Sequence, residues 1–219
     1  GLHVYIQPLA DFVIEHYFPE CRATEQPYVA LIDAIAQRTA ELVAGWQSVG
    51  FCHGVLNTDN MSLLGLTIDY GPFGFLDAYD RHHVCNHSDN GGRYAYNEQP
   101  YVTHWNMTRL ASCFLPLASE AELVSVLDAY PNYFQVAYLA NMRAKLGLQT
   151  EQKDDKELID TLFNALQGRK VDFTLFFRYL SEVENHPTTT LPEKLLALFN
   201  GPTDVILVLI NIYHSRLQA

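Results

Sequence analysis

Basic residues are scarce in this sequence, and its first 50 residues contain no lysine. The 219 residues carry 14 Lys and Arg against 25 Asp and Glu, which gives a formal net charge of −11. Nucleic acids and anionic membrane surfaces bind proteins through local excesses of positive charge. We therefore expect neither nucleic acid nor membrane as a partner, and any group that holds phosphate must be local or lie outside this chain.

Long apolar runs and clustered cysteines are missing as well. No run of about 18 apolar residues could span a bilayer, and no stretch has the pattern of a signal peptide. The four cysteines form no CxxC pair, which is typical of a reducing compartment. Hydrophobic residues make up 48% of the chain, which is enough to bury the core of one domain of this size.

Most of the chain has the three-and-four spacing of apolar residues that indicates a helix buried along one face. One such helix is predicted over 28–46, after Pro27 and before Gly50. The remaining predicted helices follow Pro100 and cover 105–114, 119–130, 133–146, 155–166, 172–183, 195–199 and 204–217.

Caps and a proline set the expected limits of three of these helices. Ser119 with Glu122, and Thr190 with Glu193, have the spacing of capping boxes. Pro131 is expected to end one helix and begin the next, because proline has no N–H to donate inside a helix.

The pattern changes between residues 51 and 100. Two short apolar runs, Met61–Leu64 and Leu66–Asp69, are separated by Gly65, and this predicts a small β-hairpin. The segment 71–100 is rich in Gly, Asn, Asp, His and Tyr without a helical period, so we expect a long ordered loop of the kind that carries function. The predicted fold is mainly α with one small hairpin.

Oxygen-bearing side chains stand at both ends of the predicted hairpin: Asp59 and Asn60 precede it, and Asp69 ends it. A tight hairpin would fold Asn60 and Asp69 towards each other. Carboxylate and amide oxygens suit Mg²⁺ that is held mainly by substrate phosphates. The order therefore indicates an ATP site, although a plain turn at Asp59-Asn60 and a strand end at Asp69 fit the spacing equally well.

The letters HGVLNTDN over 53–60 are similar to the H-G-D-x-x-x-x-N motif of kinase-like phosphotransferases. His53, Gly54 and Asn60 match this motif, but Val55 stands where such kinases have a catalytic Asp. Valine cannot accept a proton, so ordinary kinase chemistry is disfavoured. Asp59, immediately before Asn60, is a carboxylate that could act as base from the same loop.

Longer sequence segments resemble those of a known family. HGVLNTDNMS (53–62), LTIDYGPFGFLDAYD (66–80) and CNHSDNGGRYAY (85–96) closely resemble the selenoprotein O family, protein adenylyltransferases with a kinase-like fold. YLANMRAKLGL (138–148) and VDFTLFFRYL (171–180) extend the resemblance over most of the chain.

The resemblance implies an activity and a set of roles. The family binds ATP in an orientation reversed from that of kinases and transfers AMP to Ser, Thr or Tyr hydroxyls of proteins, its partners being ATP and protein substrates. By motif position, Asp59 would be the catalytic base, Asn60 a ligand of Mg²⁺ (or Mn²⁺), and Asp69 both a metal ligand and an ATP contact. Bacterial members would be cytoplasmic and eukaryotic ones mitochondrial.

Some family features have no match in this sequence. Members carry an amino-terminal lobe with a glycine-containing nucleotide loop, a Lys–Glu ion pair and arginines that grip phosphates, and a carboxy-terminal tail with a redox-active Cys or selenocysteine. We therefore expect residues 1–219 to form a single domain, the carboxy-terminal lobe of a kinase-like fold. Because half of the active site would lie on the missing lobe, we expect this chain alone to be inactive or nearly so.

Two other functions stay open. The first is a non-catalytic pseudokinase that binds nucleotide and acts as an interaction scaffold. The second is a conventional kinase of proteins or small molecules, which Val55 disfavours.

The loop also contains a group of potential zinc ligands. Their spacing matches no standard zinc pattern, so a hydrogen-bonded loop that shapes the protein-substrate platform is favoured. The residues concerned are His82, His83, Cys85, His87 and Asp89.

Three further side chains have structural interpretations. His53 is expected to be a buried histidine bonded to backbone near Asp69. Arg93 fits either a contact to substrate or phosphate or an internal salt bridge, and Arg109 is expected to pair with a nearby carboxylate.

Overall fold

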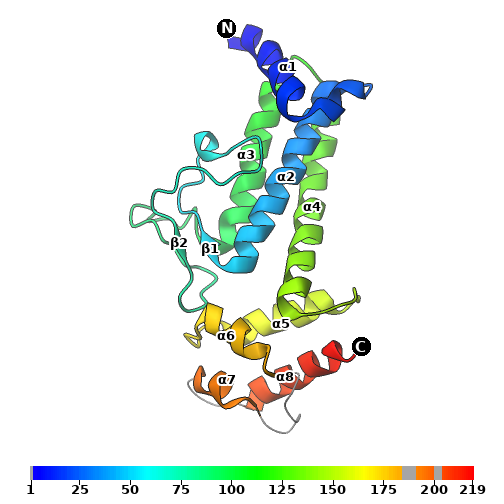
Figure 1. Ribbon diagram of the computed structural model, residues 1–219. Coiled ribbons are helices and arrows are strands. Elements are labelled where there is room, and N and C mark those ends of the chain that lie inside the picture. Colours follow the sequence, from blue (N-terminus) through cyan, green and yellow to red (C-terminus); the bar gives the residue numbers. More distant parts are fainter. Residues whose placement is uncertain (1, 184–190, 200–203) are drawn as a thin grey trace.

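The computed structural model describes residues 2–183, 191–199 and 204–219 (Figure 1). The chain is mainly helical, as predicted, and contains one small antiparallel sheet. In chain order the elements are η1 Leu2–Tyr5, α1 Ile6–Tyr17, η2 Pro19–Ala23, α2 Pro27–Val49, β1 Phe51–Cys52, η3 Thr58–Asn60, β2 Gly74–Phe75, η4 Tyr96–Glu98, α3 Gln99–Cys113, α4 Glu120–Leu146, α5 Asp155–Leu166, α6 Phe173–Leu180, α7 Glu193–Ala197 and α8 Asp204–Leu217.

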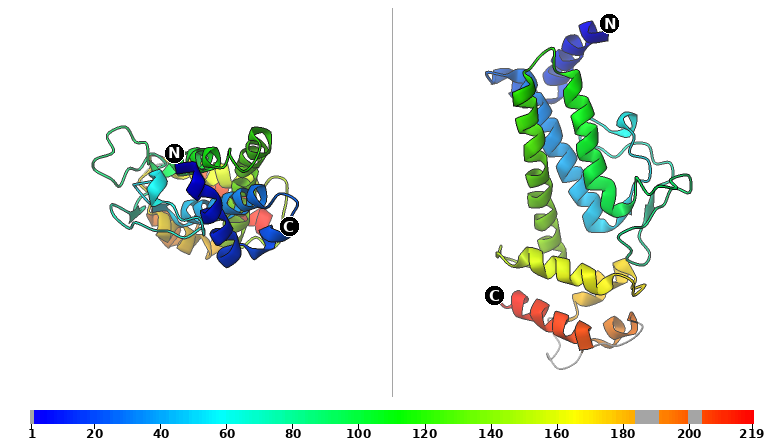
Figure 2. Two further views of the ribbon diagram at one scale, coloured as in Figure 1. Left: turned by 90° about the horizontal axis from the view of Figure 1, so that it is seen from above. Right: turned by 180° about the vertical axis from the view of Figure 1, so that it is seen from behind.

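Three long helices, α2, α3 and α4, lie side by side and form the body of the molecule (Figures 1 and 2). Helix α1 lies at one end of this bundle, and α5 to α8 lie at the other. The segment between β1 and α3, coloured cyan to green, runs along one side of α2 and α3. The predicted site residues are all in this segment.

Helix α2 confirms the prediction over 28–46 and ends at Gly50, which has a left-handed φ of 72°. A Cβ at Gly50 would lie 2.9 Å from the Phe173 ring, so both the backbone conformation and the close packing require glycine there. The turn leads directly into β1.

The predicted break at Pro131 is wrong, because α4 runs without interruption from Glu120 to Leu146. Proline lacks the N–H that would bond to the carbonyl four residues earlier, at Leu127. Nε2 of His104, on α3, lies 3.0 Å from that carbonyl oxygen and donates to it instead. The Ser119–Glu122 capping box at the start of α4 is present as predicted.

The predicted hairpin is also wrong, because other segments form the sheet. Gly65 does turn the chain, with φ 68°, but neither Met61–Leu64 nor Leu66–Asp69 forms a strand. The sheet instead pairs Phe51 with Phe75 and Cys52 with Gly74. Asn60 and Asp69 therefore lie on the connection between the two strands and not on a hairpin that carries them.

Contacts with α2 and β1 explain this difference. Trp46 Nε1 donates to Thr67 Oγ1 at 2.9 Å, and His53 Nε2 lies 2.8 Å from the Ile68 carbonyl oxygen. Leu63 and Leu64 pack against the apolar cluster that α1, α2 and α4 share. The Ile68 carbonyl is thus bonded to a side chain and not to a neighbouring strand, and the other contacts hold the segment against α2.

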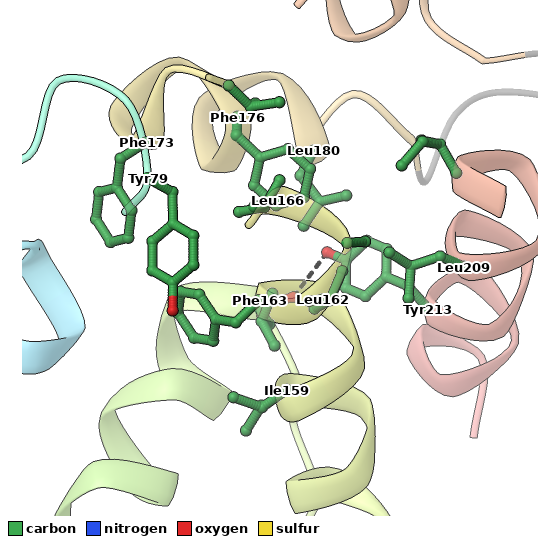
Figure 3. Packing of buried hydrophobic residues seen from close by; sticks show 14 of the residues in the cluster. Tyr79, Ile159, Leu162, Phe163, Leu166, Phe173, Phe176, Leu180, Leu209 and Tyr213 are labelled. Carbon is green, nitrogen blue, oxygen red and sulfur yellow. Dashed lines mark hydrogen bonds between the residues drawn. The ribbon is translucent and has the colours of Figure 1, made fainter. Parts of the chain in front are cut away.

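The core of the α5–α8 end is built from aromatic and aliphatic side chains (Figure 3). Phe173 and Phe176 are fully buried, and Phe177 and Tyr179 pack against the same cluster. Tyr79, from the loop after β2, stacks on Phe173 with ring centroids 6.2 Å apart. The loop is thus anchored on the helical end of the chain.

A buried carboxylate joins three helices near the carboxy terminus. Asp155, 1% exposed at the start of α5, accepts from Arg216 Nε of α8 at 2.7 Å and lies 3.6 Å from Arg143 of α4. Burial alone would raise the pKa of Asp155, but the hydrogen bonds from Arg216 and the Gln152 N–H lower it below its usual value.

Two further outcomes concern the ends of the chain. Helix α1 lies where no element was predicted, and it buries Ala10, Val13 and Ile14. Glu193 begins α7, but its predicted capping partner Thr190 lies outside the described residues. Among the described residues, no helix combines the length and hydropathy needed to cross a membrane.

Candidate active site

His53 connects the two segments that carry the predicted site residues. This residue follows β1 directly and is 1% exposed. Nε2 lies 2.8 Å from the carbonyl oxygen of Ile68, and Nδ1 lies 3.4 Å from the backbone nitrogen of Val55. A carbonyl oxygen only accepts, so Nε2 carries the proton and Nδ1 accepts from Val55. One imidazole thus ties the loop of Asp59 and Asn60 to the residue before Asp69.

Burial lowers the pKa of His53, which favours this neutral form. Its own backbone N–H donates to Gln99 Oε1 at 2.8 Å, while Gln99 Nε2 donates to the Phe51 carbonyl at 2.9 Å. Gln99 is fully buried at the start of α3. The predicted role of His53 as a buried residue bonded to backbone near Asp69 is confirmed.

Asn60 and Asp59 lie on the single turn η3. Asn60 donates its backbone N–H to Asn57 at 3.0 Å and its Nδ2 to the Val55 carbonyl at 3.2 Å. With the amide nitrogen bonded to Val55, Oδ1 is the end of the side chain left to accept a cation or a donor. Asp59 is exposed and makes no ion pair within the described part of the chain.

Asp69 has a left-handed backbone, with φ 55°, which is uncommon outside glycine and often marks a functional constraint. Its side chain is exposed, and among the described residues it has no ion-pair partner. A Cβ at Gly71 would come 3.4 Å from Asp69 Oδ1, so the small residue leaves room beside the carboxylate. Neither Asp69 nor Asn60 is buried in a salt bridge.

These donors fit a hard divalent ion that takes most of its ligands from phosphate and water. Asn60 offers one amide oxygen and Asp69 one carboxylate, which is the small protein contribution usual for Mg²⁺ on a nucleotide. Within residues 2–183, 191–199 and 204–219, no group of three or more His, Cys, Asp or Glu side chains could hold a metal by itself.

The loop that contained the possible zinc ligands is built from hydrogen bonds. Asp89 accepts from the backbone N–H groups of Arg93 and Tyr94, at 3.0 and 2.8 Å. Tyr94 in turn donates its hydroxyl to Asn57 Oδ1 at 2.6 Å. The loop thereby fixes Asn57, the residue immediately before η3.

Sequence reasoning missed four residues that hold the site: Asn57, Asn86, Tyr94 and Gln99. Asn86 Nδ2 donates to the Gly54 carbonyl at 3.1 Å, and these two residues are 32 positions apart in the sequence. Gln99 accepts from the N–H of His53, 46 positions earlier. Such distant polar contacts have no local spacing signal, although the word CNHSDNGGRYAY already included Asn86 and Tyr94.

Two cysteines meet beside the same loop. Cys52 Sγ and Cys85 Sγ are 3.3 Å apart, and both are free thiols. Burial, together with the hydrogen bond and charge of Cys85, raises the pKa of Cys52 to about 12. A Cβ at Gly54 would lie 2.7 Å from Cys85 Sγ, so glycine is needed where the two segments cross.

Among the described residues, Arg109 does not have its expected carboxylate partner, and Arg93 does not form an internal salt bridge. Instead, both stack on Trp105, with guanidinium carbons 4.9 Å (Arg93) and 5.2 Å (Arg109) from the ring centroid.

Comparisons with known proteins show the family to which the chain belongs. The family model "Protein adenylyltransferase SelO" matches residues 3–219. Three relatives carry the name "Protein nucleotidyltransferase YdiU". The protein from Ralstonia nicotianae is 48% identical over a match that covers 84% of this chain and 38% of the relative. The protein from Burkholderia ambifaria is 50% identical over 97% of this chain and 43% of its own length. The protein from Variovorax paradoxus is 50% identical over 81% of this chain and 37% of its own length.

The chain belongs to the SelO protein adenylyltransferase family. It spans about two fifths of the length of the curated relatives it matches.

Proposed function

We propose that the intact protein transfers AMP from ATP to Ser, Thr or Tyr hydroxyls of proteins, and that this chain is the carboxy-terminal lobe of its kinase-like fold. The observation that carries the proposal is the position of His53, bonded on one side to the Asp59-Asn60 loop and on the other to the residue before Asp69. Membership of the SelO family supplies the reaction class.

Asp59 is the proposed catalytic base. It would accept the proton of the acceptor hydroxyl as that oxygen attacks the α-phosphorus of ATP; the new oxygen–phosphorus bond replaces the bond to the β-phosphate, and pyrophosphate leaves. Its exposed carboxylate, free of an ion pair among the described residues, is accessible to a protein substrate. Val55, at the position of the usual kinase base, leaves this role to Asp59.

Asn60 and Asp69 are the proposed ligands of Mg²⁺ (or Mn²⁺), and Asp69 is also the proposed ATP contact. When bound, the ion would offset negative charge on the phosphates. The free Oδ1 of Asn60 and the unpaired carboxylate of Asp69 support these roles.

The amino-terminal lobe of the same protein is the proposed partner of an exposed aromatic surface beside Asp69. Tyr70, Phe73 and Phe75 are 58%, 43% and 58% exposed and cluster around Phe51. Exposed apolar groups of this size commonly mark an interface. Without that lobe we expect this chain alone to transfer AMP weakly or not at all.

The decisive experiment compares incorporation of label from α-labelled and γ-labelled ATP by the full-length protein and by its Asp59→Asn and Asp69→Asn variants. We expect α-label transfer that either substitution abolishes. Asp128→Asn removes a charge from an exposed position on α4, outside the segment of the proposed site residues, and should leave transfer unchanged.

The same assay separates the alternatives. Transfer of γ-label without α-label would identify a conventional kinase. Nucleotide binding without either transfer would identify a pseudokinase scaffold. Because the named relatives are bacterial and the reaction consumes ATP, we propose that it takes place in the bacterial cytoplasm.

A further inference from the structure

Two arginines share one exposed indole close to the proposed base. Trp105 is 39% exposed, and the guanidinium groups of Arg93 and Arg109 both lie over its ring. The two distances to the ring centroid place their guanidinium carbons no more than about 10 Å apart. We call these three side chains the Arg–Trp–Arg patch.

The patch adjoins the Asp59 loop on both of its sides. Arg109 lines a cavity of about 250 Å³ together with Thr58 and Met61, which flank Asp59-Asn60. On the other side, Tyr94 follows Arg93 directly and bonds to Asn57. These two contacts place the patch next to the loop that carries Asp59.

Neither arginine of the patch forms an ion pair among the described residues. Between residues 51 and 110 the sequence has three basic residues, Arg81, Arg93 and Arg109, and Arg81 donates to Asn164 at 2.7 Å. Of the carboxylates near the patch, Asp89 accepts the backbone N–H groups of Arg93 and Tyr94, and Glu98 accepts from Asn97. Within the described structure, the guanidinium groups of Arg93 and Arg109 therefore keep donors for the carboxylates of a ligand.

We propose that the Arg–Trp–Arg patch binds acidic side chains of the protein substrate that flank the hydroxyl to be modified. The proposal rests on the proposed function. Guanidinium groups pair with carboxylates through parallel hydrogen bonds, and stacking on Trp105 holds them in place. Acidic residues at i and i+2 of an extended segment lie roughly 7 Å apart, a separation that the two guanidinium groups can span.

Binding is tested first, without ATP and with the full-length protein. A fluorescent peptide with one Ser and two Glu at i and i+2 is compared with its Gln counterpart by anisotropy. We expect the Glu peptide to bind more tightly, and Arg93→Gln with Arg109→Gln to raise its Kd about 10-fold while the Gln peptide is unaffected. Arg178→Gln, an exposed arginine on α6, is the matched control and should change nothing.

AMP transfer to the same two peptides is measured next. The double variant should raise KM for the Glu peptide about 10-fold and leave kcat and the KM for ATP unchanged. Arg93→Glu with Arg109→Glu should reverse the preference towards a peptide with Lys at the two positions, an outcome that a purely structural role would not give.

The outcomes separate this proposal from the proposed function. Equal binding of the Glu and Gln peptides, or a preference that survives the double substitution, overturns the patch as a docking surface. A rise in KM for ATP with peptide preference intact would assign the arginines to nucleotide phosphate and also overturn it. Arginine-dependent binding of the Glu peptide without any AMP transfer would support the patch and refute the proposed function.

Discussion

His104 on α3 supplies the hydrogen bond that Pro131 removes from α4. Its Nε2 donates to Leu127, the carbonyl four residues before the proline, at 3.0 Å, and its ring stacks on Tyr130 with centroids 5.0 Å apart and planes 4° from parallel. A helix that proline would otherwise interrupt stays continuous because a neighbouring helix satisfies the exposed carbonyl.

This relationship predicts coupling between the two residues. His104→Phe should destabilise the chain by about 1–3 kcal/mol, because it leaves the Leu127 carbonyl without a partner. In a Pro131→Ala background the helix can bond that carbonyl itself, so the same substitution should cost clearly less. Urea denaturation of the four variants measures the coupling, and additive effects would show that His104 does not serve the Leu127 carbonyl.

His53→Phe should lower AMP transfer by about 100-fold in the full-length protein, because displacement of catalytic groups by about an ångström can have that effect. The variant keeps the buried ring but loses the bonds to Ile68 and Val55. Circular dichroism should show an unchanged helix content. Transfer at the wild-type rate would mean that the two segments are held by other contacts.

The protonation of His53 gives a pH prediction. Because burial lowers its pKa, the folded state favours the neutral ring; the associated stability is full above the unfolded pKa of about 6.5 and is lost as the pH falls through the folded value. NMR of the ring nitrogens should therefore show protonated Nε2 and unprotonated Nδ1 at pH 7, and the titration midpoint of the ring should lie below that of an exposed histidine. A midpoint at or above that of an exposed histidine would contradict the assigned bonds.

Arg216→Met should destabilise the chain by about 3 kcal/mol at pH 7, because it leaves the buried carboxylate of Asp155 with Arg143 as its remaining charged partner. Since the folded pKa of Asp155 is lowered, its contribution is full above the unfolded value near 4 and is lost as the pH falls through the folded one. The difference from wild type in urea denaturation should thus narrow below about pH 4. Arg178→Met is the control, since Arg178 forms no ion pair among the described residues.

Gly54→Ala tests the close crossing of the loop with Cys85. Gly54 has φ 80°, and the added Cβ would lie 2.7 Å from Cys85 Sγ and 3.2 Å from the Pro72 carbonyl oxygen. Gly147→Ala is matched to it, since Gly147 has φ 72° and open space around the new Cβ. Backbone strain alone should lower the free energy of unfolding by about 1–2 kcal/mol in both variants. The clash at Gly54 should make the loss of stability larger in Gly54→Ala, and this variant should also transfer less AMP. Equal losses at the two glycines would show that the crossing tolerates a methyl group.

The amino-acid sequence by itself determined most of the helices, because apolar periodicity and caps are local signals. These signals predicted helices α2, α5 and α8 and the capping box of α4. The words around Asp59, Asn60 and Asp69 also indicated the family, which a match over residues 3–219 shows. The roles of these three residues stay predictions.

Tertiary structure decided what depends on partners distant in the chain. Pro131 stays inside a helix because His104 reaches it from α3, and the segments around Asn60 and Asp69 are joined by His53 and Trp46 instead of pairing as a hairpin. Within the described structure, Arg109 lies over the ring of Trp105, four residues earlier on the same helix, and not beside the expected carboxylate. Local spacing predicts which residues can form a helix or a strand. Which partner each hydrogen-bond donor and acceptor takes depends on side chains from distant segments, and these come into contact only when the elements pack.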